Sequence, residues 1–245
     1  MIDQATELRK LVLRAMRDGS QAFGPAPRLV LLTAGHSGVG VTSLGVNLSV
    51  AMAEQGLRVV LVDAEAQPHG VAALCGLSAG DSSADLSVAR RDIHEVLQRG
   101  PAGIQIVPGL RVDTTEQDAR RLSMERFIRQ LMKLGRYADS VVVDLGQGTS
   151  YPVRRVTQVA DDVIIVTTPD NVSVADAYAH IKLSLSGAGS ARLWLVVNLA
   201  DEPVARDVHQ RIRQSCERFL GHGIDLLGWV PGDRYVGVSV LLWTP

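Results

Sequence analysis

The chain has 245 residues, of which 46% are hydrophobic and 21% are charged, and its net charge is −1. A chain of this length can bury a large core and form one α/β domain without cross-links. The near-neutral charge argues against a strongly basic nucleic-acid surface. No apolar run approaches the ~18–20 residues that span a bilayer. The N-terminal sequence MIDQATELRK lacks the apolar core of a signal peptide, so we expect a cytoplasmic protein.

The first residues predict a helix that is tethered to the main domain. Residues 1–17 are amphipathic, because Leu8, Leu11, Val12 and Ala15 share one face at helical spacing. The sequence DGSQAFGPAP at 18–27 contains glycines and prolines that break a helix, which indicates a linker. The main domain is therefore expected to cover residues 28–245.

Apolar runs alternate with helical stretches through the rest of the chain. These runs are continuous rather than alternating in polarity, which is typical of strands buried on both faces of a parallel sheet. The fold class predicted is α/β, a doubly wound and mostly parallel sheet with helices on both faces. The predicted strands are 28–34, 58–63, 104–109, 140–146, 162–169, 192–198 and 224–231. A basic amphipathic helix is predicted over 119–136, with Leu122, Phe127 and Leu131 as its core stripe.

The sequence GHSGVGVT follows the first predicted strand and precedes a helix predicted over 43–55. A glycine-rich turn in this context lets backbone N–H groups surround an anion at a helix N-terminus, as in phosphate-binding loops. The candidate nucleotide-binding residues here are Gly35, His36, Ser37, Gly38, Val39, Gly40, Val41, Thr42 and Ser43. Thr42 lies where a hydroxyl would ligate Mg²⁺.

Two predicted strands contain an acid near their carboxyl ends, Asp63 after VVLV and Asp144 after VVV. Ligands of open α/β sheets bind at these ends, so we expect both acids to face the loop, where they could hold Mg²⁺ through water. Glu65 follows Asp63 by two residues and could position an attacking water. The alternative for all three is a helix cap or a solvated turn.

The chain resembles the MinD/ParA branch of P-loop ATPases, whose loop reads KGGxGK[TS]. More narrowly, it resembles the MinD-like regulators of flagellar number and placement, the FlhG/YlxH type. The stretches that carry the narrower resemblance are DQATELRKLV, VVVDLGQGTS, VTTPDNVSVADAYAHIKL, and LWLVVNLADEPVARDVHQRI followed by LLGWVPGD. The similarity covers nearly the whole chain.

The resemblance implies ATP or ADP with Mg²⁺ as the cofactor. It implies that the loop holds the phosphates and that Thr42 and Asp63 serve Mg²⁺. Glu65 stands where the family has a catalytic aspartate, and Asp144 with residues 146–148 corresponds to the switch that senses the γ-phosphate. The residues implied at the adenine are Asn198 and Asp233.

The resemblance also implies partners. The helix containing Asp3, Gln4, Leu8 and Arg9 corresponds to the one that engages the SRP-type GTPase FlhF, and flagellar basal-body proteins and a second copy of the chain are further implied partners. The family ends in a membrane-targeting helix. Here VGVSVLLWTP has no basic residue after Arg234, so we expect a terminal helix packed on the domain rather than one at the inner face of the cell membrane.

Two departures from the family set the functional expectation. Both loop lysines are absent: His36 replaces the lysine that reaches a partner's phosphates, and Val41 replaces the P-loop lysine. We therefore expect impaired ATPase activity in an interaction protein with a degenerate site. The alternatives are a working ATPase that dimerises on ATP and a ParA-type DNA-partition ATPase, the latter disfavoured by the near-neutral charge.

Overall fold

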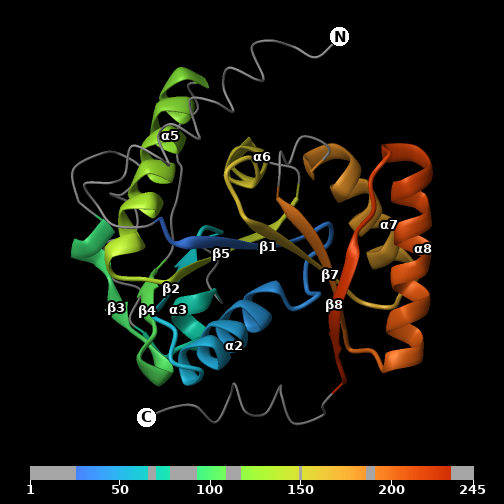
Figure 1. Ribbon diagram of the computed structural model, residues 1–245, viewed down its shortest axis with the longest axis horizontal. Coiled ribbons are helices and arrows are strands. Elements are labelled where there is room, and N and C mark those ends of the chain that lie inside the picture. The colour runs from blue at the N-terminus through green and yellow to red at the C-terminus, as the bar shows by residue number, and fades with distance from the viewer. Residues whose placement is uncertain are drawn as a thin grey trace.

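The computed structural model describes residues 26–65, 70–77, 93–108, 117–148, 151–185 and 191–232. Within these residues one eight-stranded sheet has the order β3-β4-β2-β5-β1-β6-β7-β8 (Figure 1). Its strands are β1 (Arg28–Ala34), β2 (Val59–Asp63), β3 (Gln98–Arg99), β4 (Gln105–Val107), β5 (Ser140–Gln147), β6 (Asp162–Thr167), β7 (Arg192–Asn198) and β8 (Asp225–Val230). β3 is antiparallel to β4, and all other neighbouring pairs are parallel.

Helices cover both faces of the sheet, which confirms the doubly wound α/β prediction (Figure 1). One face carries α2 (Val41–Glu54) and α3 (Val71–Leu74). The other carries α5 (Gln117–Lys133), α6 (Tyr151–Thr157), α7 (Asn171–His180) and α8 (Glu202–Leu220). A π-helical turn (Ile181–Leu185) continues α7, and short 3₁₀ turns occupy Ile93–Val96, Pro101–Gly103 and Leu134–Arg136.

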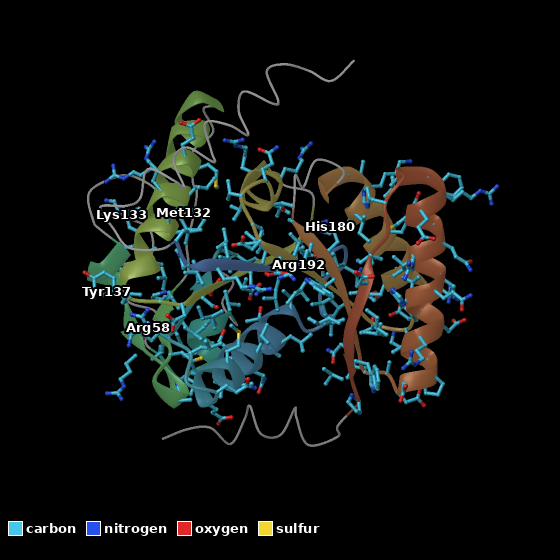
Figure 2. The ribbon with its side chains drawn as sticks, viewed as in Figure 1. Arg58, Met132, Lys133, Tyr137, His180 and Arg192 are labelled. Carbon is cyan, nitrogen blue, oxygen red and sulfur yellow. The ribbon has the colours of Figure 1, made fainter. Side chains whose placement is uncertain are left out.

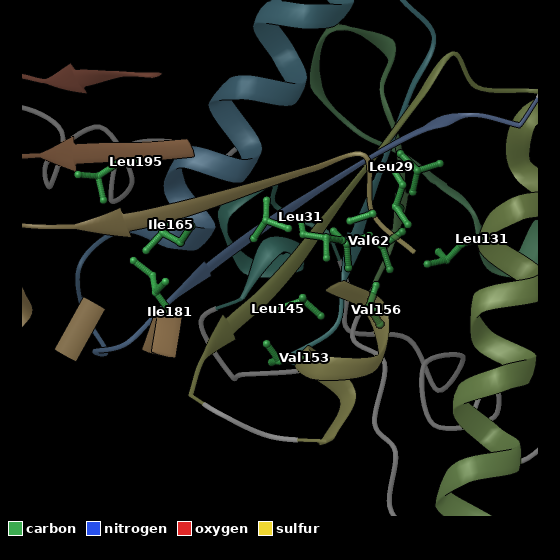
Figure 3. Close-up of a cluster of buried hydrophobic side chains, with 14 of the residues drawn as sticks. Leu29, Leu31, Val62, Leu131, Leu145, Val153, Val156, Ile165, Ile181 and Leu195 are labelled. Atoms are coloured by element: carbon green, nitrogen blue, oxygen red, sulfur yellow. The ribbon is translucent and has the colours of Figure 1, made fainter. Parts of the chain in front are cut away.

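The strands are apolar throughout because each strand supplies both hydrophobic cores. Successive side chains of a strand point to opposite faces of a sheet. In β1, Leu29 and Leu31 pack in the core under α5 to α8, whereas Val30 and Leu32 pack in the core under α2. Figure 3 shows the first of these cores, in which Leu31 lies among side chains from neighbouring strands and helices.

The predicted elements differ from the observed ones mainly at their ends. β7 has its predicted bounds, and α2 begins at Val41, two residues earlier than predicted. β3 was not predicted, because two polar residues carry no apolar pattern. Phe127 and Leu131 of α5 are buried as expected. The predicted helix at 1–17 lies outside the described residues.

The strand order places a topological switch point at β1. β1 lies between β5 and β6. After β1 the chain forms β2, β4 and β5 on one side of β1. After β5 it crosses to the other side, where it forms β6, β7 and β8. In open α/β sheets ligands bind at such a point, beyond the carboxyl ends of the strands. The connection from β1 to α2, residues 35–40, begins there.

At the amino ends of the central strands, a buried carboxylate connects neighbouring strands. Asp162 opens β6, and its side chain is 4% exposed. It accepts hydrogen bonds from Arg28 Nε of β1 at 2.7 Å and from Trp194 Nε1 of β7 at 2.8 Å. Arg192 Nη2 lies 2.9 Å away, and its guanidinium stacks over the Trp194 ring (Figure 2 labels Arg192). Burial opposes ionisation, but the hydrogen bonds outweigh it and hold the pKa of Asp162 below its usual range. Three strands are thus joined through one side chain.

Replacing this carboxylate should destabilise the protein. We expect Asp162→Asn to lower the free energy of unfolding by about 2–3 kcal/mol, because both arginines lose their charged partner at a desolvated site. Urea unfolding followed by circular dichroism measures this change. Glu217→Gln is the matched control, since Glu217 pairs with Arg213 on the exposed face of α8 and should cost less than about 0.5 kcal/mol. Equal losses in the two variants would contradict the assignment.

Candidate functional site

The loop between β1 and α2 has backbone angles that depend on glycine. Gly38 and Gly40 have φ values of 76° and 96°. Gly40 also caps α2 without a side-chain hydrogen bond, and its carbonyl accepts the amide of Leu44. A side chain at Gly40 would collide with the amide nitrogen of Asn198. The tight turn thus brings the chain against β7 as it enters the helix.

Asn198 holds this loop in place. Its Nδ2 donates to the carbonyl of Val39 at 2.8 Å, and its Oδ1 accepts the amide of Leu199 at 3.0 Å. Both ends of the side-chain amide are therefore engaged by backbone groups. The resemblance implies that Asn198 contacts adenine, and in the structure its side chain also holds the loop.

The N-terminus of α2 points its electropositive end at the loop. The first turn of a helix has unpaired N–H groups and a partial positive charge, which together favour an anion. The first turn of α2 carries no acidic residue that would oppose this charge. Neither lysine nor arginine occurs from Gly35 to Ser43. The loop therefore offers backbone dipoles to an anion but no lysine or arginine side chain of its own.

Val41 contributes to the core instead. It is the first residue of α2, it is 7% exposed, and it packs in the cluster that includes Val39 and Leu61. This is the position at which the resemblance calls for the loop lysine. The apolar packing of Val41 replaces the ammonium group that would otherwise neutralise phosphate charge.

His36 is bound within its own chain. Its Nδ1 lies 3.1 Å from Oδ2 of Asp176 on α7, and both side chains are nearly half exposed. The neighbouring Gly35 lies so close to α7 that a side chain there would collide with the backbone carbonyl of Asp176. The loop is thus held against α7 at its first two residues, with Ser37 and Gly38 exposed beyond them.

Asp63 and Asp144 lie side by side at the carboxyl ends of β2 and β5. Their Cα atoms are register partners. Asp63 accepts the backbone amides of Glu65 at 3.2 Å and of Val71 at 3.1 Å, so it also caps α3. The structure therefore brings the two predicted acids together, and the capping alternative describes part of what Asp63 does.

The pKa of Asp144, near the carboxyl end of β5, is strongly shifted. Burial raises its pKa to about 6, and the charges of Asp63 and Glu65 add to the rise. Hydrogen bonds from the Thr42 hydroxyl and the Gly146 amide, the latter 2.9 Å from Oδ1, act in the opposite direction. Oδ2 is buried and has no hydrogen-bond partner among the described residues. Buried oxygens are rarely left unsatisfied, so this one is a candidate ligand position.

The carboxyl end of β5 and the residue that follows it lie against both the loop and Glu65. The amide of Gly148 donates to the carbonyl of Ala34, the last residue of β1, at 3.0 Å. Gly146 has a φ of 59°, and any side chain there would collide with the carboxylate of Glu65. The predicted switch, 146–148, is therefore adjacent to the predicted phosphate loop.

The oxygen atoms of Thr42, Asp63 and Asp144 fit part of the coordination shell of a magnesium ion, and a bound ligand would supply the rest. Mg²⁺ prefers oxygen ligands and usually retains waters beside one or two carboxylates and substrate phosphates. The Thr42 hydroxyl, the free Oδ2 of Asp144 and the adjacent Asp63 supply such oxygens. The part of the chain that is described has no group of three His, Cys, Asp or Glu side chains able to hold a metal by themselves. Phosphate oxygens would have to complete the coordination.

Several predicted residues cannot be compared. Asp3, Gln4, Leu8, Arg9 and Asp233 lie outside the described residues. Conversely, Asp176 contacts the loop, Thr33 contacts Gly146 of the switch, and His180 contacts Thr33, and the sequence analysis gives these residues no role. The DAYAHIK stretch was recognised as a family signal, but its side-chain contacts are not visible in a pattern. In the regions described, no helix is both long and apolar enough to cross a membrane.

Comparisons with known proteins agree on one family. The ParA family model, described as NUBPL iron-transfer P-loop NTPase, matches residues 26–201. The antiactivator FleN of Pseudomonas aeruginosa is 30% identical over 214 residues, covering 87% of this chain and 76% of FleN. The flagellum site-determining protein YlxH of Helicobacter pylori is 25% identical over 180 residues, covering 72% of this chain and 59% of YlxH. The septum site-determining protein MinD of Pyrococcus horikoshii, solved with Mg-ADP, has a TM-score of 0.68 at 20% identity, covering 89% of this chain and 87% of that one.

The raised pKa of Asp144 predicts a pH dependence of stability. Between the ordinary value of 3.8 and about 6, the folded protein keeps a proton that the unfolded chain has lost. The contribution of Asp144 to the free energy of unfolding is therefore largest below pH 4 and is lost as the pH rises through 6. The whole change is about 3 kcal/mol.

Asp144→Asn should lack this dependence. We expect its stability relative to the parent protein to rise by up to about 3 kcal/mol between pH 4 and pH 7. Urea unfolding at pH 4, 5, 6 and 7, without nucleotide or magnesium, measures the difference, in which contributions from other groups cancel. A constant offset between the two proteins across this range would contradict the prediction.

Proposed function

Because the chain belongs to the ParA family of P-loop NTPases, we propose that it is a MinD-like regulator of flagellar number or placement with a degenerate nucleotide site. Its site would bind ATP or ADP with Mg²⁺ weakly and hydrolyse ATP slowly or not at all. The names of two relatives, the antiactivator FleN and the flagellum site-determining protein YlxH, support the flagellar role.

The observation that carries the proposal is the replacement of both loop lysines. Val41 is buried in the core, and His36 is paired with Asp176 of its own chain. Each charge-assisted hydrogen bond to phosphate is worth roughly 1.5–3 kcal/mol. The loss of two such bonds weakens binding by roughly a hundredfold or more. Hydrolysis suffers further, because a cation placed at the transition state is worth about 10³–10⁵ in rate.

Nearby acidic side chains make the lack of positive charge at the loop more unfavourable for phosphate binding. Asp63, Glu65 and Asp144 converge on the edge at which phosphates would lie, and their charges already disfavour ionisation of Asp144. Without the ammonium groups, the charge of a triphosphate must be offset by Mg²⁺ and the backbone dipoles of α2 alone. On this proposal the backbone geometry of the site is kept, but the lysine ammonium groups that would neutralise the triphosphate charge are absent.

The partner-binding element of the proposal is the helix that the sequence predicts over residues 1–17. Asp3, Gln4, Leu8 and Arg9 match the motif DQAxxLR, which in the resembling family engages the SRP-type GTPase FlhF. A regulator that works by contact needs this helix whether or not its site turns over ATP. Flagellar basal-body proteins are further candidates for the same regulatory role.

A second function is favoured by a different observation. Thr42 still contacts Asp144, whose Oδ2 remains available, and this supports a magnesium-binding role for these two residues. A protein with these features could be an ATP-dependent switch that dimerises on nucleotide, with other cations replacing the lysines. ATP-dependent dimerisation of the purified protein in gel filtration would favour this second function.

Restoring the lysine tests the degenerate site. We expect Val41→Lys to tighten binding of ATP with Mg²⁺ by about 10- to 100-fold, because one charge-assisted hydrogen bond returns. Isothermal titration calorimetry measures the change. Val41→Met is the matched control, since its side chain is unbranched like lysine but carries no charge, and its affinity should equal that of the parent. Micromolar ATP binding and measurable turnover by the parent protein would overturn the proposal.

The helix prediction is tested by direct binding to the GTPase. We expect Leu8→Asp and Arg9→Glu each to weaken binding to purified FlhF at least about tenfold, because each removes a contact of the recognition motif. Biolayer interferometry measures the affinity, and urea unfolding checks that the domain is unchanged. Lys10→Ala, which lies outside the motif, is the control and should bind normally. Undiminished binding by both motif variants would exclude this helix as the docking element.

A further inference from the structure

A buried hydrogen-bonded chain connects α7 to the carboxyl end of β5. His180, the last residue of α7, is 1% exposed, and Thr33 on β1 is fully buried. The Thr33 hydroxyl lies 3.2 Å from the carbonyl oxygen of Gly146 and 3.2 Å from Nε2 of His180. Figure 2 shows His180 between α7 and the sheet. Three segments that are distant in the sequence therefore meet at one hydroxyl.

The direction of these hydrogen bonds follows from what each group can do. A carbonyl oxygen only accepts, so the Thr33 hydroxyl donates its proton to Gly146. The hydroxyl oxygen must then accept from Nε2 of His180, which fixes the imidazole in the tautomer with hydrogen on Nε2. Burial lowers the pKa of His180 to about 4, so the ring is neutral at physiological pH. Nδ1 is an acceptor and has no partner among the described residues.

Gly146 is held from both sides. Its carbonyl is fixed by Thr33, and its amide donates to Oδ1 of Asp144 at 2.9 Å. Two residues later the amide of Gly148 is fixed by Ala34 at 3.0 Å. The lack of a side chain at Gly146 also leaves room for the carboxylate of Glu65. The orientation of 144–148 thus depends on a small number of hydrogen bonds, one of which leads to α7.

We propose that His180 is a positioning residue, which fixes the carbonyl of Gly146 through Thr33 and so couples α7 to the segment 144–148. α7 also holds the loop through the contact of Asp176 with His36. One helix is therefore linked to both segments, directly to the loop and through Thr33 to residues 144–148. The π-helical turn at Ile181–Leu185 follows His180 directly, and such turns occur frequently at functional sites.

This coupling does not depend on how tightly the site binds nucleotide. A change in the position of α7, produced by a ligand or by a partner, would reach the 144–148 segment through Thr33 in either case. The inference therefore goes beyond the proposed function, and it can be tested on the free protein.

Hydrogen exchange of the full chain without nucleotide tests the coupling. We expect Thr33→Val and His180→Leu each to speed exchange of the Gly146 and Gly148 amides by about three- to tenfold, the effect of losing one hydrogen bond. Exchange in β7 should be unchanged, which separates a local release from global destabilisation. The double variant should exchange no faster than the faster single variant, because both changes break the same connection.

Conservative variants separate positioning from packing. Thr33→Ser keeps the hydroxyl and His180→Gln keeps an N–H donor, so both should restore the parent exchange rates at Gly146 and Gly148. These milder changes also provide a test if Thr33→Val or His180→Leu does not fold. Parent-like exchange at Gly146 and Gly148 in both disruptive variants, or equal acceleration in the conservative and disruptive ones, would overturn the proposal.

Discussion

The buried carboxylate of Asp144, placed beside Asp63 and Glu65, is the constraint on which the site depends. Three acids at one edge of a sheet repel one another, and burial leaves Asp144 with a raised pKa and one unsatisfied oxygen. Such an arrangement is unfavourable in the free protein and becomes favourable when a cation is present. The acids lie close together because β2 and β5 are adjacent parallel strands, whose carboxyl ends are neighbours.

The phosphate side of the same site lacks a matching charge. The glycine turn, the Asn198 bond to Val39 and the N-terminus of α2 preserve a surface that could receive an anion. Yet Val41 is buried and His36 is paired within the chain, so the loop supplies no ammonium group. The molecule therefore combines a cluster of acids at the carboxyl ends of β2 and β5 with a loop that has no lysine or arginine. This imbalance is the basis of our proposal that the chain regulates by contact rather than by ATP turnover.

The fold was predictable from the sequence because the central strands lie between two cores, so their continuous, short apolar runs, such as RLVLLTA, indicate buried strands. The loop and both aspartates were predictable because glycines and acids directly follow these runs. The contacts of Asp176, Thr33 and His180 were not, because they join residues more than 110 positions apart through single side chains. β3 escaped prediction for another reason, since its two polar residues are placed by pairing with β4 alone.

The most direct test of the central claim is release of inorganic phosphate from millimolar ATP by the purified full chain, with and without Mg²⁺. Thr42→Val, which removes the hydroxyl beside Asp144, gives the background rate. If the lysine-free loop cannot neutralise the triphosphate, the parent protein releases phosphate no faster than this variant. Magnesium-dependent release well above that of Thr42→Val would contradict the account, because some other group would then supply the missing positive charge.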